Sequence, residues 1–276
     1  MGNSARTGGM AVPEGDRFRL SGRWDLVSGC DHQDWLILFG MVLEGDGPRF
    51  VAPSMPDIRA FFVPRSQVAI VDKWYVLGLR GTGSNEVLVD RVHVDGSLAP
   101  APFAPSRIDR TLYRVPIFTN AAAGGAAVCL GLARGAIADL MALAATKVSI
   151  RGAEPIAGHP EVQAAVARAD IELRAARAAF RQALAAVTAT ADAGEPASLV
   201  ERGRVRSAMT LAAETAREVT LRMFQLAGSS AIYDEHPLQR RLRDVLVATQ
   251  HVMLQPLWYE EAGRTQFGLD PTLPVL

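Results

Sequence analysis

The period at which apolar residues recur changes once along the chain, at a stretch between residues 100 and 116 that carries four prolines. Before it, short runs of aromatic and β-branched residues are separated by Gly, Pro, Asp and Ser, a pattern typical of strands. After it, apolar residues recur in steps of three and four, as on the buried face of long helices. The 276 residues are therefore expected to form a β domain followed by a helical domain, an α+β chain.

The strand-like runs occupy the first third of the chain. They are Phe18–Leu20, Trp24–Val27, Trp35–Leu43, Arg59–Val63, Val68–Val71 and Val87–Val94. Their spacing predicts an antiparallel β domain, a barrel or sandwich, over residues 17–99. A flexible N-terminus is expected over residues 1–16, and residues 100–116 form the connector.

The remainder predicts an antiparallel four-helix bundle over residues 117–265, with a tail over residues 266–276. The first helix is expected at about Ile117–Thr146, and the second follows apolar steps over residues 162–187. Ser198 and Glu201 form a capping box at the start of the third helix. The fourth is expected at about Leu238–Gly263, and exposed apolar stripes on such helices predict oligomerisation.

Charge and cysteine content exclude several partners. Acidic and basic residues balance at 29 each, with neither sign concentrated, which argues against nucleic acid or an anionic membrane surface. Cys30 and Cys129 match no metal-ligand spacing and indicate free thiols in a reducing compartment, hence the cytoplasm. The N-terminus lacks the apolar segment of a secretory signal. The longest apolar stretch, residues 121–132, is too short to span a bilayer.

The stretch Leu238–His251 concentrates polar chemistry. It follows Pro237, which suits the first turn of a helix because the amide that it lacks has no partner there. A helix over this stretch places Arg240, Asp244 and His251 along one face. An ion pair at four-residue spacing and an ordinary histidine explain the pattern as well as a functional site does.

Common catalytic motifs are absent: there is no phosphate-binding P-loop, no His-Glu-x-x-His and no nucleophile elbow. The run Gly81–Ser84 suggests a dinucleotide loop, but strand-like residues 87–94 follow where a helix is required. A tight hairpin is expected there, or a turn whose glycines bring backbone amides close to a ligand.

Four segments, in this order, resemble the acyl-CoA dehydrogenase fold from about Gly9 to the C-terminus. They are Leu20–Trp35, Trp74–Ser84, Phe224–Ser230 and Ala262–Arg264. Within that superfamily they look most like two-component flavin-dependent monooxygenases that hydroxylate aromatic and polycyclic substrates. Related enzymes begin with a helical domain that this sequence lacks, so a partner chain is one expected source of that domain.

The resemblance implies a flavin site. Gly22 and Ser28 match a family pattern in which a glycine stands six residues before a hydroxyl residue that bonds the N5 edge of the flavin. Ser28 is then expected to orient the isoalloxazine ring and to act in catalysis. The resemblance places further residues at the cofactor, namely Trp24, Arg80, Gln225, Gly228 and Ser229. The last three belong to a segment that reaches the flavin phosphate or adenosine of a neighbouring subunit.

The stretch after Arg243–Asp244 bears on the type of reaction. Many acyl-CoA dehydrogenases place a catalytic glutamate about nine residues past the arginine of such a pair. This sequence has Thr249, Gln250 and His251 there, with no acid. The resemblance implies that His251 lies near the reactive face of the flavin, where it deprotonates a phenol or steadies the flavin peroxide.

The resemblance therefore implies a flavin-dependent monooxygenase, or a subunit of one, acting on an aromatic or polyketide-like substrate with reduced FMN or FAD and O2. A flavin reductase and a homo-oligomer, dimer or tetramer, are the expected partners, with no metal. Two alternatives stay open. One is an acyl-CoA dehydrogenase relative with a displaced base, and the other is a non-catalytic paralogue whose helices only mediate oligomerisation.

Overall fold

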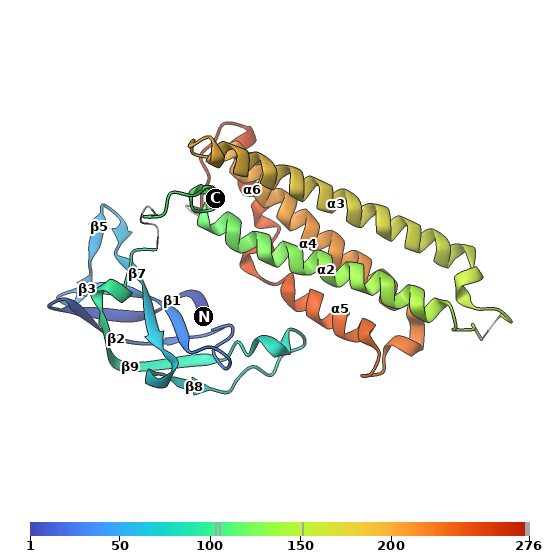
Figure 1. The fold of residues 1–276 in the computed structure, drawn as a ribbon, viewed down its shortest axis with the longest axis horizontal. Helices are drawn as coiled ribbons and strands as arrows, with labels where there is room; N and C mark the ends of the chain where they lie inside the picture. Colours follow the sequence, from blue (N-terminus) through green and yellow to red (C-terminus); the bar gives the residue numbers. More distant parts are fainter. Residues whose placement is uncertain (103, 105, 151, 274–276) are drawn as a thin grey trace. The chain divides into compact units, whose positions relative to one another are not determined.

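The structure is a computed structural model that describes residues 1–102, 104, 106–150 and 152–273. It divides into two compact units, Met1–Val76 with Arg80–Pro105, and Leu77–Leu79 with Ser106–Leu276. The first unit is built from strands and the second mainly from helices (Figure 1). The expected α+β class is confirmed. We call the two parts the β unit and the helical unit.

The β unit contains one curled sheet in the strand order β4-β3-β1-β2-β9-β8, with β7 also paired to β3 (Figure 1). Its elements are β1 (Gly2–Glu14), β2 (Arg17–Trp24), β3 (Trp35–Glu44), β4 (Gly47–Pro48), β5 (Phe50–Ala52), β6 (Met55–Pro56), β7 (Ile58–Pro64), η1 (Arg65–Gln67), β8 (Ala69–Val71), η2 (Arg80–Thr82), β9 (Glu86–Asp95) and η3 (Gly96–Leu98). Strands β5 and β6 form a separate small pair. Burial alternates along β3, as expected of a strand with one face on a core.

Three expectations for this unit are wrong. The N-terminus is not flexible, because β1 pairs with both β2 and β3, and the sheet is not purely antiparallel, because β1 and β3 run parallel. Residues Asp25–Val27 lie outside the sheet, since β2 ends at Trp24. The small polar residues of β1 lack the apolar alternation that reveals a strand. Gly9 is needed there because a Cβ would clash with the Trp24 ring.

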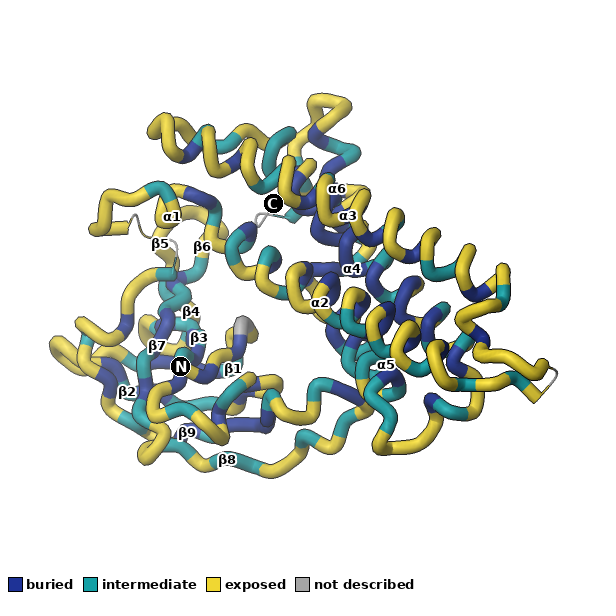
Figure 2. The backbone as a smooth tube through the Cα atoms, turned by 45° about the vertical axis from the view of Figure 1, so that its right-hand side comes forward, coloured by how far each residue is buried: buried dark blue, intermediate teal, exposed yellow. Residues whose placement is uncertain are grey.

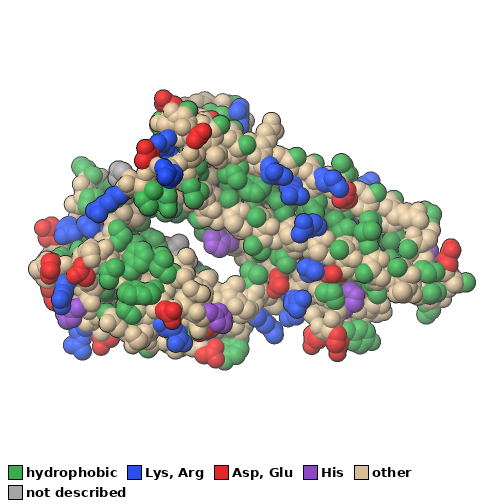
Figure 3. Space-filling model, viewed as in Figure 1, with side chains coloured by type: hydrophobic (Ala, Val, Ile, Leu, Met, Phe, Trp, Pro, Cys, Tyr) green, Lys and Arg blue, Asp and Glu red, His purple; other side chains and the backbone are tan. Residues whose placement is uncertain are grey.

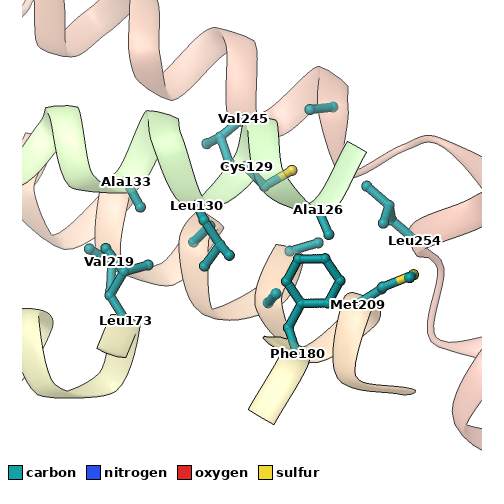
Figure 4. Close-up of a cluster of buried hydrophobic side chains, with 14 of the residues drawn as sticks. Ala126, Cys129, Leu130, Ala133, Leu173, Phe180, Met209, Val219, Val245 and Leu254 are labelled. Carbon is teal, nitrogen blue, oxygen red and sulfur yellow. The ribbon is translucent and has the colours of Figure 1, made fainter. Parts of the chain in front are cut away.

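The helical unit is built around three long helices. Its elements are α1 (Thr111–Arg114), α2 (Ile117–Ala144), η4 (Ile156–Gly158), α3 (Pro160–Asp192), α4 (Leu199–Ala227), η5 (Gly228–Ala231), α5 (Pro237–Ala248), η6 (Val252–Leu254) and α6 (Leu257–Gln266). Helix α4 packs against α2, α3, α5 and α6. Buried residues follow the inner faces of the long helices in Figure 2, and Figure 4 shows Phe180, Leu130 and Met209 in their shared core.

Two reciprocal hydrogen bonds form the start of α4. The expected capping box is confirmed, because the Ser198 hydroxyl accepts from the Glu201 amide at 3.2 Å and the Ser198 amide donates to Glu201 Oε2 at 2.9 Å.

Helix α2 is long and apolar enough, by length and composition, to cross a membrane, which corrects the shorter estimate from residues 121–132. In the structure 39% of its most apolar 18-residue window is buried within the protein.

The expected fourth helix over Leu238–Gly263 is wrong, because it is interrupted. Helix α5 ends at Ala248, the 3-10 turn η6 follows, and α6 begins at Leu257. Pro256 has no amide hydrogen and disfavours helical backbone in the residue before it, so a continuous helix is blocked there. His251 consequently lies in the turn after α5 rather than on the helix face shared by Arg240 and Asp244.

Candidate active site

Ser28 lies in a turn between β2 and β3 whose backbone is held on both sides. Its amide donates to the Asn3 carbonyl at 2.9 Å, and its carbonyl accepts from the Asn3 amide at 3.0 Å. Leu26 and Gly29 have φ angles of 57° and 82°. A left-handed conformation costs free energy for a side chain such as leucine, and such residues concentrate at functional sites. The turn therefore presents Ser28, which is exposed, in a fixed conformation.

Three hydroxyl groups form a row at this turn. Ser28 Oγ lies 2.8 Å from Ser84 Oγ, and Ser84 Oγ lies 2.7 Å from Thr82 Oγ1. Ser84 is only 5% exposed, whereas Ser28 is open to solvent. Each hydroxyl has one proton to donate. If Ser28 donates outward to a ligand, it accepts from Ser84, and Ser84 then accepts from Thr82.

The segment that carries Ser84 is fixed by Asn85. The side-chain oxygen of Asn85 accepts from the amides of Lys73 and Trp74, both at 2.9 Å, and its nitrogen donates to Asp31 at 2.9 Å. The Thr82 backbone carbonyl accepts from the Gly29 amide at 2.8 Å. The expected tight hairpin is therefore wrong: a long connection over residues 72–85 joins β8 to β9, and η2 lies within it.

The other two candidates in the β unit differ in accessibility. Trp24 is fully buried, and its indole N–H donates to the Phe39 carbonyl at 2.7 Å. Its side chain belongs to the core of the β unit, and its expected place at a cofactor stays a prediction. Arg80 is exposed, with Nε donating to the Val76 carbonyl at 2.8 Å. Its remaining guanidinium nitrogens suit a phosphate.

Cys30 and Cys129 are both buried and free, in agreement with the expected thiols. Cys30 Sγ donates to the Gly83 carbonyl at 3.2 Å, which links the Ser28 turn to the segment before Ser84. Burial raises the pKa of the Cys129 thiol to about 11, so this sulfur is protonated and unreactive at neutral pH.

In the helical unit, Arg243 and Asp244 hold the segment Leu77–Leu79. Asp244 Oδ1 accepts from the Leu79 amide at 2.6 Å, and Arg243 Nη1 donates to the Leu77 carbonyl at 3.3 Å. Between them, a Cβ on Gly78 would clash with the Arg243 backbone. The expected Arg240–Asp244 ion pair is absent from the described residues, because Asp244 binds this backbone instead.

His251 forms the N-cap of η6. Its Nδ1 accepts a hydrogen bond from the Met253 amide at 3.2 Å. Although the residue is exposed overall, desolvation by neighbouring protein atoms lowers the pKa of the imidazole, and the charge of Arg206 lowers it further. The imidazole is therefore neutral at neutral pH.

Gln225, Gly228 and Ser229 lie where α4 passes into η5. Gln225 and Ser229 are exposed, and Gly228 ends α4 with a φ of 56°. The Gly228 amide donates to the Gln225 carbonyl, so it is not free for an anion as expected. Lys147 supplies the positive charge here, with Nζ 2.6 Å from the Ala227 carbonyl. Lys147 is not among the residues predicted from the sequence.

Comparison with known proteins identifies the family. Residues 123–256 match the model described as "Acyl-CoA dehydrogenase, C-terminal domain". Indole-3-acetate monooxygenase of Pseudomonas putida is 32% identical over 98% of this chain and 70% of its own length. The chain belongs to the flavin-dependent monooxygenases of the acyl-CoA dehydrogenase superfamily. It spans about 70% of the length of that relative.

Solved structures of similar proteins have the same fold. The HsaA monooxygenase of Mycobacterium tuberculosis, the oxygenase subunit of a flavin-dependent monooxygenase, superposes with a TM-score of 0.87 at 28% identity, covering 100% of this chain and 71% of that one. XiaF from Streptomyces, solved in complex with FADH2 and glycerol, gives a TM-score of 0.89 at 25% identity, covering 100% and 70%.

In this flavin-dependent monooxygenase, the sequence motifs selected Ser28 and His251 as candidates but did not identify the residues that contact them. Ser28, Ser84 and Thr82 are brought together in the β unit, and His251 and Arg206 in the helical unit. Thr82 and Ser84 occur in a run read as a turn, and Arg206 occurs in an apolar helical pattern. Only the three-dimensional contacts distinguish these residues from ordinary turn and core positions.

Proposed function

We propose that the chain is the oxygenase component of a two-component system that hydroxylates an aromatic or polyketide-like substrate with reduced FMN or FAD and O2. A separate flavin reductase would supply the reduced flavin. The observation that carries this proposal is the neutral, exposed His251 at the position where a dehydrogenase carries a carboxylate. Family membership supports the flavin chemistry, and the relatives' names support an aromatic substrate.

The Ser28 turn fits a flavin. An exposed hydroxyl with a fixed hydrogen-bond donor behind it suits the polar edge of an isoalloxazine ring. Arg80 would provide positive charge for the cofactor's phosphate. In the helical unit, Lys147 beside Gln225, Gly228 and Ser229 would provide it for the phosphate of a neighbouring subunit's cofactor, as the family resemblance implies. The bound reduced flavin supplies the electrons that activate O2. Ser28 orients the ring, and Ser84 holds the Ser28 hydroxyl.

The acyl-CoA dehydrogenase alternative requires a carboxylate base, and one nearby candidate is already engaged. Glu261 is 5% exposed, and its Oε2 accepts from the Thr272 amide at 2.8 Å and from the Leu273 amide at 3.3 Å. The Thr272 hydroxyl also donates to this carboxylate, and this bond, followed by the two amide bonds, lowers the pKa of Glu261, so it is a poor proton acceptor. A displaced base at this residue is therefore disfavoured.

We also propose that the chain forms a homo-oligomer and that its long helices, with α5 and α6 together as the fourth, form the antiparallel bundle typical of the superfamily. Large apolar side chains stay exposed on α2 and α3, among them Val128, Met141 and Ile171. Hydrophobic side chains are spread over the visible face of these helices (Figure 3). Such surfaces support association with a second copy.

The proposed function is tested with a His251→Ala variant and a flavin reductase. The variant is expected to quench FMN or FAD fluorescence like the wild type, because Ser28 and Arg80 are unchanged, but to lose hydroxylation. Unchanged coupled hydroxylation in this variant would contradict the role of His251. Failure of wild-type protein to quench either flavin would favour the non-catalytic alternative. Bleaching of bound flavin by an acyl-CoA without oxygen would favour the dehydrogenase.

A further inference from the structure

Arg206 is a buried cation without an acidic partner. Its side chain is 1% exposed, and Nη1 and Nη2 donate to the Phe118 carbonyl at 3.4 Å and to Met253 Sδ at 3.5 Å. Its Nε is buried with no hydrogen-bond partner, and among the described residues no carboxylate forms an ion pair with it. Burial lowers the pKa of the guanidinium to about 10, so Arg206 keeps its charge at neutral pH. Burying a cation without an acidic partner costs stability, so a functional reason for Arg206 is worth seeking.

The contacts of Arg206 lead to the turn that carries His251. The guanidinium carbon lies 3.7 Å from the centre of the Trp258 ring, a cation–π contact. The Trp258 indole N–H donates to the Val252 carbonyl at 2.8 Å. Through Trp258 and Met253, Arg206 therefore supports both residues that follow His251.

The hydrogen bond at Nδ1 determines what His251 presents to solvent. A neutral imidazole has one N–H, and a nitrogen that accepts a hydrogen bond carries no proton. Because Nδ1 accepts from the Met253 amide, the proton is on Nε2. The free side of His251 is then a hydrogen-bond donor. For Nε2 to act as a base, the proton would have to move to Nδ1, against the Met253 N–H.

Protonation of both nitrogens is opposed by the surroundings of η6. Helices α2 and α4 pack against η6. Helix α2 contributes the Phe118 carbonyl to Arg206 and places Gly125 against Leu254, whereas α4 contributes the Arg206 charge. Among the described charged groups, Arg206 is the one whose field acts on the imidazole. This cation disfavours a second positive charge at His251.

We propose that Arg206 is a positioning residue that fixes His251 as a neutral imidazole with its proton on Nε2, so that His251 acts on an oxygen atom of the substrate or oxidant as a donor. The use of this donor in hydroxylation rests on the proposed function. The tautomer and its control by Arg206 do not, because both are properties of the protein without flavin or substrate.

The experiment is nitrogen-15 NMR of the full chain labelled at histidine, recorded against pH for wild type, Arg206→Met, Arg206→Lys and Arg202→Met. A His251→Gln variant assigns the signals. Arg202 is the matched control: it lies one turn earlier on α4, and its Nε is also buried without a partner. The Arg202→Met variant also loses one positive charge on α4, but it keeps the contacts of Arg206 with Trp258 and Met253. Methionine keeps an unbranched apolar chain, and chemical unfolding checks that each variant is folded.

The wild-type spectrum is expected to show His251 as the Nε2–H tautomer. Arg206→Met is expected to raise the pKa of His251 and to increase the share of the Nδ1–H form, and Arg206→Lys to restore the lower pKa because it keeps the charge. An Nδ1–H tautomer in the wild type would overturn the proposal. Identical His251 titrations in the Arg206→Met and Arg202→Met variants would overturn it as well. Either result leaves the hydroxylation assay with reductase as an independent test of the proposed function.

Discussion

The Ser28 turn and the His251 turn are both fixed, but by different means. Ser28 is held by backbone hydrogen bonds, a left-handed Leu26 and neutral hydroxyl groups. His251 accepts one backbone hydrogen bond, from Met253, and the turn that carries it depends further on packing by Trp258 and the buried Arg206. Backbone geometry tolerates the loss of one side chain, whereas a buried cation and its aromatic partner depend on each other. The two regions should therefore respond very differently to mutation.

The largest effect is expected from Trp258→Ala. It removes a fully packed aromatic ring and the surface on which Arg206 stacks, so we expect a loss of about 3–5 kcal/mol in the free energy of unfolding. Chemical denaturation of the variant measures this loss. Phe267→Ala, which truncates an aromatic side chain that is 86% exposed just after α6, is the control and should change stability by less than about 1 kcal/mol. Equal losses of unfolding free energy in the two variants would contradict a stabilising role for the packing of Trp258 against Arg206.

A smaller loss is expected in the β unit from Gly9→Ala. The added Cβ would clash with the buried Trp24 ring, and overpacking of this kind costs about 1–3 kcal/mol. Gly47→Ala is the control, because a Cβ there meets no atom within 4 Å. Thermal unfolding of both variants measures the difference. A Gly9→Ala variant as stable as the wild type would contradict the close packing of β1 against Trp24.

Ser84→Ala should separate function from stability. The variant loses the donor behind Ser28 at a cost of about 1 kcal/mol in stability, while the backbone of the turn keeps its bonds. Flavin affinity, measured by fluorescence quenching, is expected to fall about fivefold to tenfold. Ser97→Ala, which alters a hydroxyl bonded to Asp95 elsewhere in the β unit, should leave affinity unchanged. Equal affinities in the two variants would remove Ser84 from the site.

These contrasts explain what the sequence revealed and what it did not. The long helices followed from apolar steps, and Ser28 and His251 followed from motifs that are local in sequence. Arg206 was not found because its partners, Phe118, Met253 and Trp258, lie on other elements. The break before α6 was missed because apolar residues continue through η6, although Pro256 marks it. Strand β1 lacks apolar alternation and is a strand because β2 and β3 pair with it.

The smallest effect concerns pH. The pKa of His251 is below its ordinary value of 6.5, so the unfolded chain binds this proton at higher pH than the folded chain does. The stability associated with the neutral ring is fully present above pH 6.5, and it is lost as the pH falls through the lower pKa that His251 has in the folded state. His251→Gln should flatten the stability curve across this interval, as measured by denaturation at a series of pH values. His236→Gln, which removes a similar cap at Leu238, controls for loss of the cap. A His251→Gln curve as steep as that of the wild type would contradict the assigned shift.

The most direct test of the central claim is transfer of oxygen. The chain, a flavin reductase and reduced flavin are incubated with a panel of phenols and indoles under ¹⁸O₂, and the products are analysed by mass spectrometry. A flavin-dependent monooxygenase is expected to place one labelled oxygen atom in a hydroxylated product, and His251→Ala is expected to abolish it. Products without label, together with bleaching of the bound flavin by an acyl-CoA in the absence of oxygen, would contradict the claim.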